Sequence, residues 1–328
     1  MLANMIPRNQ IQSNHGFGGQ AKNNDTLAPQ ILIACWLVEG LSAIFLVLRI
    51  FCKLIRSRRL WYDDYILIAA WLFQTGNVVL VTVNVTLGEG QHVYNVDPAH
   101  LPTLGLNGNI SGTLSILAAC LSKTSFGVTL LRLTQTRPFV RISVWFLIIS
   151  MNVALGLSAV FIWAQCNPPA KNWNPDIEGT CWPPTFTSKY GIFSGSYSAF
   201  ADFALSIIPW PMIWKLHMLT KEKIGVGIAV SMGVLSGIAA IAKTVQLRFL
   251  SSGDFTYYES EVVIWGTVET GVAIIAASIP FLRVLIVEAK SSLTRNQREL
   301  TPEKYYPARD HPAGSRKFVP TSDNVEIE

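Results

Sequence analysis

The sequence predicts an all-α fold, in which a polytopic membrane protein forms a bundle of seven transmembrane helices. Half of its 328 residues are hydrophobic and 14% are charged, whereas a soluble domain carries about 25% charged residues. The apolar residues form long runs, and a bilayer core requires about 20 apolar residues per helix. Basic residues gather in every second link between the runs. Because cytosolic loops keep an excess of Lys and Arg, this alternation predicts an N-terminus outside and a C-terminus in the cytosol.

The segment 56–65, which we call the hinge, separates the first two apolar runs. Arg58 and Arg59 lie in its first half, and Asp63 and Asp64 open the next predicted helix. The basic residues place the hinge in the cytosol. The two aspartates would favour the positive N-terminal end of that helix and could pair with Arg58 or Arg59. We therefore interpret the hinge as a determinant of topology and a helix cap.

The predicted transmembrane domain covers 29–286 and lies between two tails that we expect to be disordered. Residues 1–28 form the expected extracellular tail, in which Asn24 begins a glycosylation sequon. Residues 287–328 are charged, have no apolar period and form the expected cytosolic tail. The seven spanning helices are expected at about 29–52, 64–87, 108–131, 142–165, 189–214, 224–247 and 262–286.

Two cysteines, Cys166 and Cys181, lie in a polar, Pro-rich loop at 166–188, on the side predicted to be extracellular. In that oxidising environment we expect a disulfide between them, and the alternative is two unpaired thiols. The bond would close a loop of about 15 residues, for which the chain-entropy model gives roughly 3 kcal/mol of stabilisation. We expect the bridged loop to cover the outer mouth of the bundle.

Five ionisable residues fall within the predicted spans: Glu39, Lys123, Asp202, Lys243 and Glu269. Charge inside a bilayer is costly unless it is paired or hydrated, so these side chains should face the interior of the bundle. We expect Lys243 to pair with Glu269, because their helices are adjacent and antiparallel, and Lys123 to pair with Asp202. The charges could form a ligand pocket or ion path that opens outward, or they could only set the register of the helices.

Other kinds of site are not predicted. The net charge of +5 comes from basic residues at the ends of apolar runs, which indicates lipid headgroups rather than nucleic acid as the partner. His92 and His100, close to Glu89 and Asp97, lack metal-ligand spacing and are expected in a solvated loop. No glycine-rich nucleotide motif, HExxH or GxSxG is present. The sequence therefore assigns no cofactor, no metal and no catalytic residue.

A series of short motifs follows in order between about residues 31 and 286. They are Asp63-Asp64-Tyr65, Gly88-x-Gly90-x-His92, Lys123-x-Ser125, Cys166-x-Pro168 with Trp173 and Gly179-x-Cys181, Asp202 with Pro209, Trp214-x-Leu216 and Lys223, and Trp265-x-x-x-Glu269 with Pro280 and Arg283. In this order the sequence resembles the fungal rhodopsin-like domain family of seven-helix membrane proteins. That family includes receptor-like proteins with an external Cys-rich domain and membrane proteins encoded beside toxin-biosynthesis genes. The resemblance implies a seven-helix fold and a role of one of these two kinds.

The sequence departs from the family pattern in two ways. The sixth helix of the family often carries Arg where Lys243 stands, so the charge is kept but the planar guanidinium that binds a carboxylate bidentately is not. The N-terminal tail contains no cysteine, so the Cys-rich outer domain is not expected. Despite the family's name, light sensing by retinal is not expected either, because residues 262–282 contain no lysine for a Schiff base.

Three functions remain open. The first is a receptor-like protein that binds an unknown small molecule from outside and signals to a cytosolic protein. The second is a transporter, although no repeat relates the first three helices to the last three, as a carrier built from repeats requires. The third is an accessory protein, scaffold or enzyme that serves a secondary-metabolite pathway beside a biosynthetic protein, with Asp202 and Glu269 as acid–base candidates. Each function places the chain in the lipid bilayer of the plasma membrane or an endomembrane.

Overall fold

The computed structural model of the protein describes residues 26–55, 60–133, 138–208, 220–249 and 255–300. The predicted sequon at Asn24 and the hinge arginines Arg58 and Arg59 lie outside these residues. The chain divides into two units, Met1–Ile286 and Val287–Glu328, each considered by itself. The contacts discussed below all belong to the first unit.

Seven long α-helices occur among the described residues. They are α2 (Ala28–Ile55), α3 (Tyr62–Leu87), α4 (Leu101–Leu133), α5 (Pro138–Ala164), α6 (Pro184–Ile207), α8 (Thr220–Gln246) and α9 (Phe255–Leu300). By length and composition, α2, α3, α4, α5 and the first part of α9 can each cross a membrane. The described apolar stretch of α8, Val230–Gln246, is shorter. The fold is therefore that of a helical, polytopic membrane protein.

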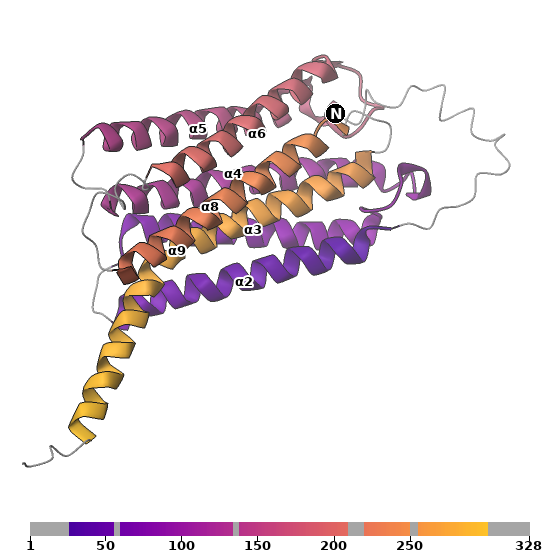
Figure 1. Cartoon of the computed structure of the whole chain (residues 1–328). Helices are drawn as coiled ribbons and strands as arrows, with labels where there is room; N and C mark the ends of the chain where they lie inside the picture. Colours follow the sequence, from indigo (N-terminus) through magenta and orange to yellow (C-terminus); the bar gives the residue numbers. More distant parts are fainter. Residues whose placement is uncertain (1–25, 56–59, 134–137, 209–219, 250–254, 301–328) are drawn as a thin grey trace, which may run out of the picture. The chain divides into compact units, whose positions relative to one another are not determined.

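The helices pack mainly on their neighbours in sequence (Figure 1). α2 packs on α3, α3 on α4, α4 on α5 and α5 on α6, and α6 packs on α8. The first part of α9 closes the bundle, because its Ile274 and Ala277 pack with Leu46 of α2 and Leu67 of α3. Two short 3₁₀ helices, η3 (Val93–Asn95) and η4 (Pro169–Asn172), lie in the loops at one end. We call this end the disulfide end and the opposite end, at Trp61–Asp64, the hinge end.

The bundle buries polar side chains and exposes apolar ones. Large apolar side chains along α2, including Ile33, Leu37 and Val47, are exposed. By contrast, Ser42 and Arg49 of α2 are fully buried. Lipid, unlike water, solvates apolar side chains and leaves polar ones to find partners inside the protein. This distribution is what a bilayer environment requires.

Glycines allow α6 and α8 to approach closely. A Cβ atom at Gly237 would lie 2.9 Å from the ring of Phe203, and one at Gly233 would collide with the Ser206 side chain. Small residues at helix contacts give membrane helices their closest packing. Gly233 and Gly237 therefore serve the packing of α8 on α6.

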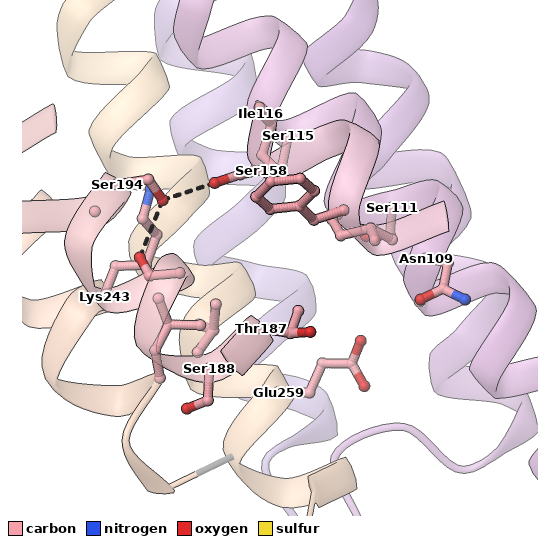
Figure 2. Close-up of a pocket in the computed structure, with 18 of the residues that line it drawn as sticks. Asn109, Ser111, Ser115, Ile116, Ser158, Thr187, Ser188, Ser194, Lys243 and Glu259 are labelled. Atoms are coloured by element: carbon pink, nitrogen blue, oxygen red, sulfur yellow. Dashed lines mark hydrogen bonds between the residues drawn. The ribbon is translucent and has the colours of Figure 1, made fainter. Parts of the chain in front are cut away.

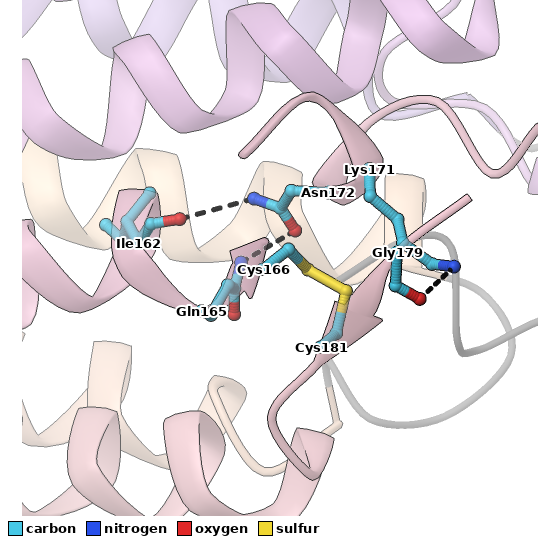
Figure 3. The surroundings of a disulfide bond; sticks show 7 residues. All are labelled: Ile162, Gln165, Cys166, Lys171, Asn172, Gly179 and Cys181. Atoms are coloured by element: carbon cyan, nitrogen blue, oxygen red, sulfur yellow. Dashed lines mark hydrogen bonds between the residues drawn. A yellow bond between two sulfur atoms is a disulfide. The ribbon is translucent and has the colours of Figure 1, made fainter. Parts of the chain in front are cut away.

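A short β-ladder and a disulfide organise the loop between α5 and α6. Strand β1 (Cys166–Asn167) pairs antiparallel with β2 (Thr180–Cys181), with Cys166 opposite Cys181. The two cysteines form a disulfide, which confirms the expected pairing (Figure 3). Gln165 donates to Asn172 at 2.7 Å. The loop is therefore a folded unit fixed to the end of α5.

Two helices extend furthest beyond their predicted bounds. α4 begins at Leu101 rather than 108, because Pro102 fits a first helical turn, where its missing N–H has no intrahelical partner. α9 begins at Phe255 and continues to Leu300, so the prediction of disorder from 287 onward is wrong for 287–300. That segment contains Glu, Ala, Lys, Leu, Arg and Gln, which are strong helix formers without needing an apolar face.

Candidate functional site

Four charged side chains from four helices meet in the middle of the bundle, and we call them the central cluster. Lys123 of α4 lies 2.9 Å from Asp202 of α6 and 2.5 Å from Glu269 of α9, measured between side-chain nitrogen and oxygen. Lys243 of α8 forms an ion pair with the second oxygen of Glu269. The cluster contains two cations and two carboxylates, so it is neutral as a whole.

Serine hydroxyl groups complete the central cluster. Ser198 accepts from Lys123 and donates to Glu269 at 2.9 Å. Ser236 donates to Asp202 at 3.0 Å. Buried charges are tolerated when each is paired and its remaining hydrogen-bonding capacity is satisfied. The serines provide these additional hydrogen bonds. The spacing of residues in the sequence did not predict that they would take part.

Both ion pairs expected from the sequence, Lys243 with Glu269 and Lys123 with Asp202, are present. The contact between Lys123 and Glu269 was not expected, and it joins the two pairs into one network. Glu39 does not belong to this network. It is buried between α2 and α3, where it accepts from the Thr75 hydroxyl at 2.6 Å.

A second group of charges, the hinge cluster, lies at the hinge end. Arg49 of α2 binds Asp63 at 2.5 Å and Asp64 at 2.9 Å. Lys53 binds Asp64 at 2.6 Å, and Arg132 of α4 binds Asp63 at 2.8 Å. Three cations thus surround two carboxylates.

Asp63 and Asp64, for which Arg58 or Arg59 was the expected partner, are buried at 0% and 1% exposure. Their described partners come from α2 and α4, because the helices converge there and bring Arg49 and Arg132 to them. The predicted helix cap is confirmed for Asp64, whose carboxylate accepts the Trp61 backbone N–H at 3.1 Å. The Trp61 ring in turn packs under the Arg132 guanidinium, 4.1 Å from its centroid.

A cavity of about 260 Å³ lies between α4, α5, α6, α8 and α9, on the disulfide side of the central cluster. Most of its lining is apolar, from residues such as Ile116, Leu155, Phe161 and Val263. Its polar lining includes Ser115, Ser158, Thr187, Ser194 and Glu259 (Figure 2). A mostly apolar cavity with a few placed polar groups is the usual form of a small-molecule site.

Lys243 joins the cavity to the central cluster. It lines the cavity (Figure 2) and its side chain is 16% exposed, while that of Lys123 is 1% exposed. Gly266 of α9 lies against the Lys243 side chain, at 3.6 Å from Lys243 Cδ to a Cβ built on the glycine. A molecule in the cavity can therefore reach one member of the network without opening the rest.

The disulfide loop supports one wall of the cavity. Trp182, next to Cys181, donates its backbone N–H to the Gln165 carbonyl at 2.8 Å. Its ring meets Phe161 edge-on at 5.8 Å, and Phe161 meets Tyr190 in the same way at 4.7 Å. Phe161 and Tyr190 both line the cavity. Edge-to-face aromatic contacts of this kind fix ring positions, so the loop shapes the wall rather than only covering the opening.

Two carboxyl groups lie near each other at the disulfide end of the bundle, and one of them, Glu259, lines the cavity. Glu259 of α9 packs over Gly108 of α4, where a Cβ atom would be 2.6 Å from its Oε1 atom. Glu89, in the loop after α3, is buried. Burial, together with the nearby charge of Glu259, raises the pKa of the Glu89 carboxyl to about 8. Glycine at position 108 therefore admits a carboxylate to the cavity rim.

Comparison with known proteins connects this arrangement to one family. Residues 48–288, which are most of the chain, match the model of the fungal rhodopsin domain. The chain belongs to the fungal rhodopsin domain family. The matched part contains the central cluster and all of the cavity lining, so these features lie inside the fungal rhodopsin domain itself.

Three curated fungal proteins are similar to parts of this fungal rhodopsin chain. Fugralins biosynthesis cluster protein 2 of Gibberella zeae is 28% identical over 38% of this chain and 31% of its own length. Receptor GIN3 of Arthrobotrys oligospora is 26% identical over 42% of this chain and 33% of its own. A SAT4 family membrane protein of Emericella nidulans is 26% identical over 64% of this chain and 54% of its own.

The chain thus matches from about a third to about half of the length of these relatives. No solved structure matches it. By their names, one of these relatives is a receptor and another is a biosynthesis-cluster protein. The resemblance stated from the motifs is therefore confirmed at the level of the family.

Proposed function

We propose that the protein is a receptor-like membrane protein that binds a small molecule in the cavity from the outer face of the membrane, without retinal. In this proposal α6 and α8 span the bilayer together with the five longer apolar helices, the disulfide end faces outward and the C-terminus is cytosolic. The similarity to Receptor GIN3 supports a receptor-like role. The observation that carries the proposal is Lys243, which belongs both to the cavity lining and to the central cluster.

The central cluster offers a physical route from the cavity to the helices. Lys243 and Lys123 hold the two oxygens of Glu269, and Lys123 also holds Asp202. Glu269 bonds to three other helices through Lys123, Ser198 and Lys243. A ligand that moved Lys243 would therefore change the hydrogen bonds and the charge balance at Glu269. Such a network has the connections that a switch between two helix arrangements requires.

Retention of small molecules by the purified protein tests ligand binding. The full chain in lipid nanodiscs is incubated with an organic extract of the producing organism's culture, washed, and analysed by mass spectrometry. We expect at least one compound to be retained by the wild type and lost in Gly191→Phe, since Gly191 lines the cavity and a phenyl ring there would fill it. Equal retention by both proteins would contradict the proposed site.

The orientation is tested separately. An epitope added at the N-terminus should be accessible to antibody on intact cells, and one added at the C-terminus only after permeabilisation. Endoglycosidase treatment that shifts the wild type but not Asn24→Gln would show that the sequon is used. Reversed epitope access would overturn the proposed topology.

A second candidate function is that of an accessory protein or transporter for a secondary metabolite. In that case the cytosolic partner would be a biosynthetic enzyme. The similarity to Fugralins biosynthesis cluster protein 2 favours it. Vesicle uptake distinguishes the candidates: a retained compound that accumulates in protein-containing vesicles, but not in empty ones, indicates transport. Saturable binding without accumulation favours the receptor-like function.

A further inference from the structure

We propose that the cavity selects an uncharged, mostly apolar small molecule through an oxygen acceptor, such as a carbonyl, that Lys243 and Ser115 bind. This inference rests on the proposed ligand-binding function and adds the chemical class of the ligand to it. We call the end of the cavity at Lys243 and Ser115 its floor, and the end at Glu259 its rim. The inference rests on the hydrogen-bond donors at the floor, the charges around them and the apolar walls.

The donor count differs between the two lysines. Lys123 donates to Ser198, Asp202 and Glu269, so all three of its N–H groups have partners. Lys243 donates to Glu269, and no second partner among the described residues accepts from it. An ammonium group has three donors. Lys243 therefore presents unused N–H donors on the side that lines the cavity.

A hydroxyl group stands beside these donors. Ser115 of α4 lines the cavity, and its Oγ atom lies 3.2 Å from a Cβ built on Gly266, the glycine that also contacts Lys243. Ser115 makes no side-chain hydrogen bond to another residue in the described parts of the chain. By contrast, Ser158 donates to Ser194 at 2.8 Å and Ser194 donates to the Gly191 carbonyl at 3.1 Å. Of the donors that line the cavity, Lys243 and Ser115 are thus the two that lie together beside Gly266.

The surrounding charge excludes an acid at this position. Glu269 and Asp202 already balance Lys123 and Lys243, so a ligand carboxylate would bring a third negative charge to two lysines. An unbalanced charge is strongly disfavoured in a buried, low-dielectric site. A carbonyl or ether oxygen can accept the same hydrogen bonds without adding charge. Glu259 at the rim disfavours a ligand anion at the other end as well.

The walls set the body of the ligand. Apolar side chains line the space between rim and floor: Ile116, Leu155, Phe161, Tyr190, Leu247 and Val263. Glu259 and Gly266, which mark rim and floor on α9, are seven residues apart in the sequence, or about 10 Å along a helix. An aromatic or aliphatic body of two rings fits that length.

Four naphthalene probes that share one apolar body test the inference. They are 2-acetylnaphthalene, which carries a neutral carbonyl, 2-naphthoate, the ammonium of 2-naphthylmethylamine, and 2-ethylnaphthalene, which has no acceptor. Saturable binding to the full-length protein in nanodiscs is measured by equilibrium dialysis against empty nanodiscs. We expect the ketone to bind at least about tenfold more tightly than each of the others, since a hydrogen bond to a charged donor is worth that much.

Variants of the wild-type protein connect this preference to the floor. Lys243→Met should weaken ketone binding about tenfold or more and reduce its advantage over 2-ethylnaphthalene, while Lys243→Arg keeps donors and part of the preference. Lys189→Met is the matched control, because Lys189 is an exposed lysine of α6. If Lys243→Met does not fold, Ser115→Ala tests the same site, and we expect it to weaken the ketone several-fold.

Two results would overturn the class of ligand. In the first, the naphthoate or the amine binds as tightly as the ketone, and Gly191→Phe removes that binding. The cavity would then still be a ligand site, but it would not select neutral acceptors. The other is a wild type that does not bind the ketone, or binds it no better than the hydrocarbon. The proposed function fails on different grounds, namely when no compound of the culture extract is retained in a manner that Gly191→Phe removes.

Discussion

The hinge cluster and the central cluster are both built from buried ion pairs between helices, but they differ in charge and surroundings. The hinge cluster joins three cations to two carboxylates and is capped by the Trp61 ring. The central cluster is neutral and borders a cavity through one partly exposed lysine. Buried ion pairs therefore do not by themselves mark a ligand site. What distinguishes the central cluster is a charged donor, Lys243, that lines a cavity.

The largest expected effect is the loss of one carboxylate at the hinge. Asp63→Asn would leave Arg49, Lys53 and Arg132 around Asp64 alone, and breaking a buried pair costs about 3–5 kcal/mol. We expect a strongly lowered Tm in nanodiscs and a low yield of folded protein. Asp176→Asn, at an exposed aspartate of the disulfide loop, is the control and should change the Tm little. Equal Tm values for both variants would show that the hinge cluster is not structural.

Loss of the disulfide should have the next largest effect. The bond closes a loop with a sequence separation of 15 residues, so Cys166→Ser should cost about 3 kcal/mol. The double variant Cys166→Ser/Cys181→Ser should be no less stable than either single variant, because all three lack the same bond. Ketone binding should weaken too, since the loop supports Phe161 through Trp182. Unchanged Tm and unchanged non-reducing gel mobility would contradict this role.

The two central lysines should differ in their effect on stability. Lys243→Met removes a single ion pair from a partly exposed position, for which we expect about 1.5–3 kcal/mol. Lys123→Met removes three partners from a fully buried position and should cost more. Unfolding of both variants in nanodiscs checks the order. A larger loss in Lys243→Met would mean that Lys243 is mainly a structural residue, and the contrast with the hinge cluster would disappear.

The last expected effect is a pH dependence at Glu89, in the loop after α3. The pKa of Glu89 is raised to about 8, so the folded protein binds more protons than the unfolded chain between about pH 4.5 and pH 8. Stability should then fall as the pH rises through this window. Glu89→Gln should flatten the decline in Tm between pH 5 and pH 8. A decline as steep as in the wild type would assign the pH dependence to other groups.

The sequence by itself determined the helical membrane fold, the disulfide and the pairing of Lys243 with Glu269. These features follow from long apolar runs, from two cysteines in one loop and from the high cost of charge in a bilayer. All three can be recognised in the linear sequence. It also identified Asp64 as a helix cap, because a cap depends on residues close in the chain.

Only the tertiary structure decided which distant partners meet. Asp63 finds Arg49 and Arg132 because α2, α3 and α4 converge at the hinge end. Lys123 joins Asp202 to Glu269 because α4, α6 and α9 converge at the central cluster. The cavity likewise exists only where small residues of several helices face one another. The spacing of residues in the sequence does not give the distance between two helices. The members of the central cluster could therefore be predicted from their charges, but the cavity beside Lys243 could not be predicted.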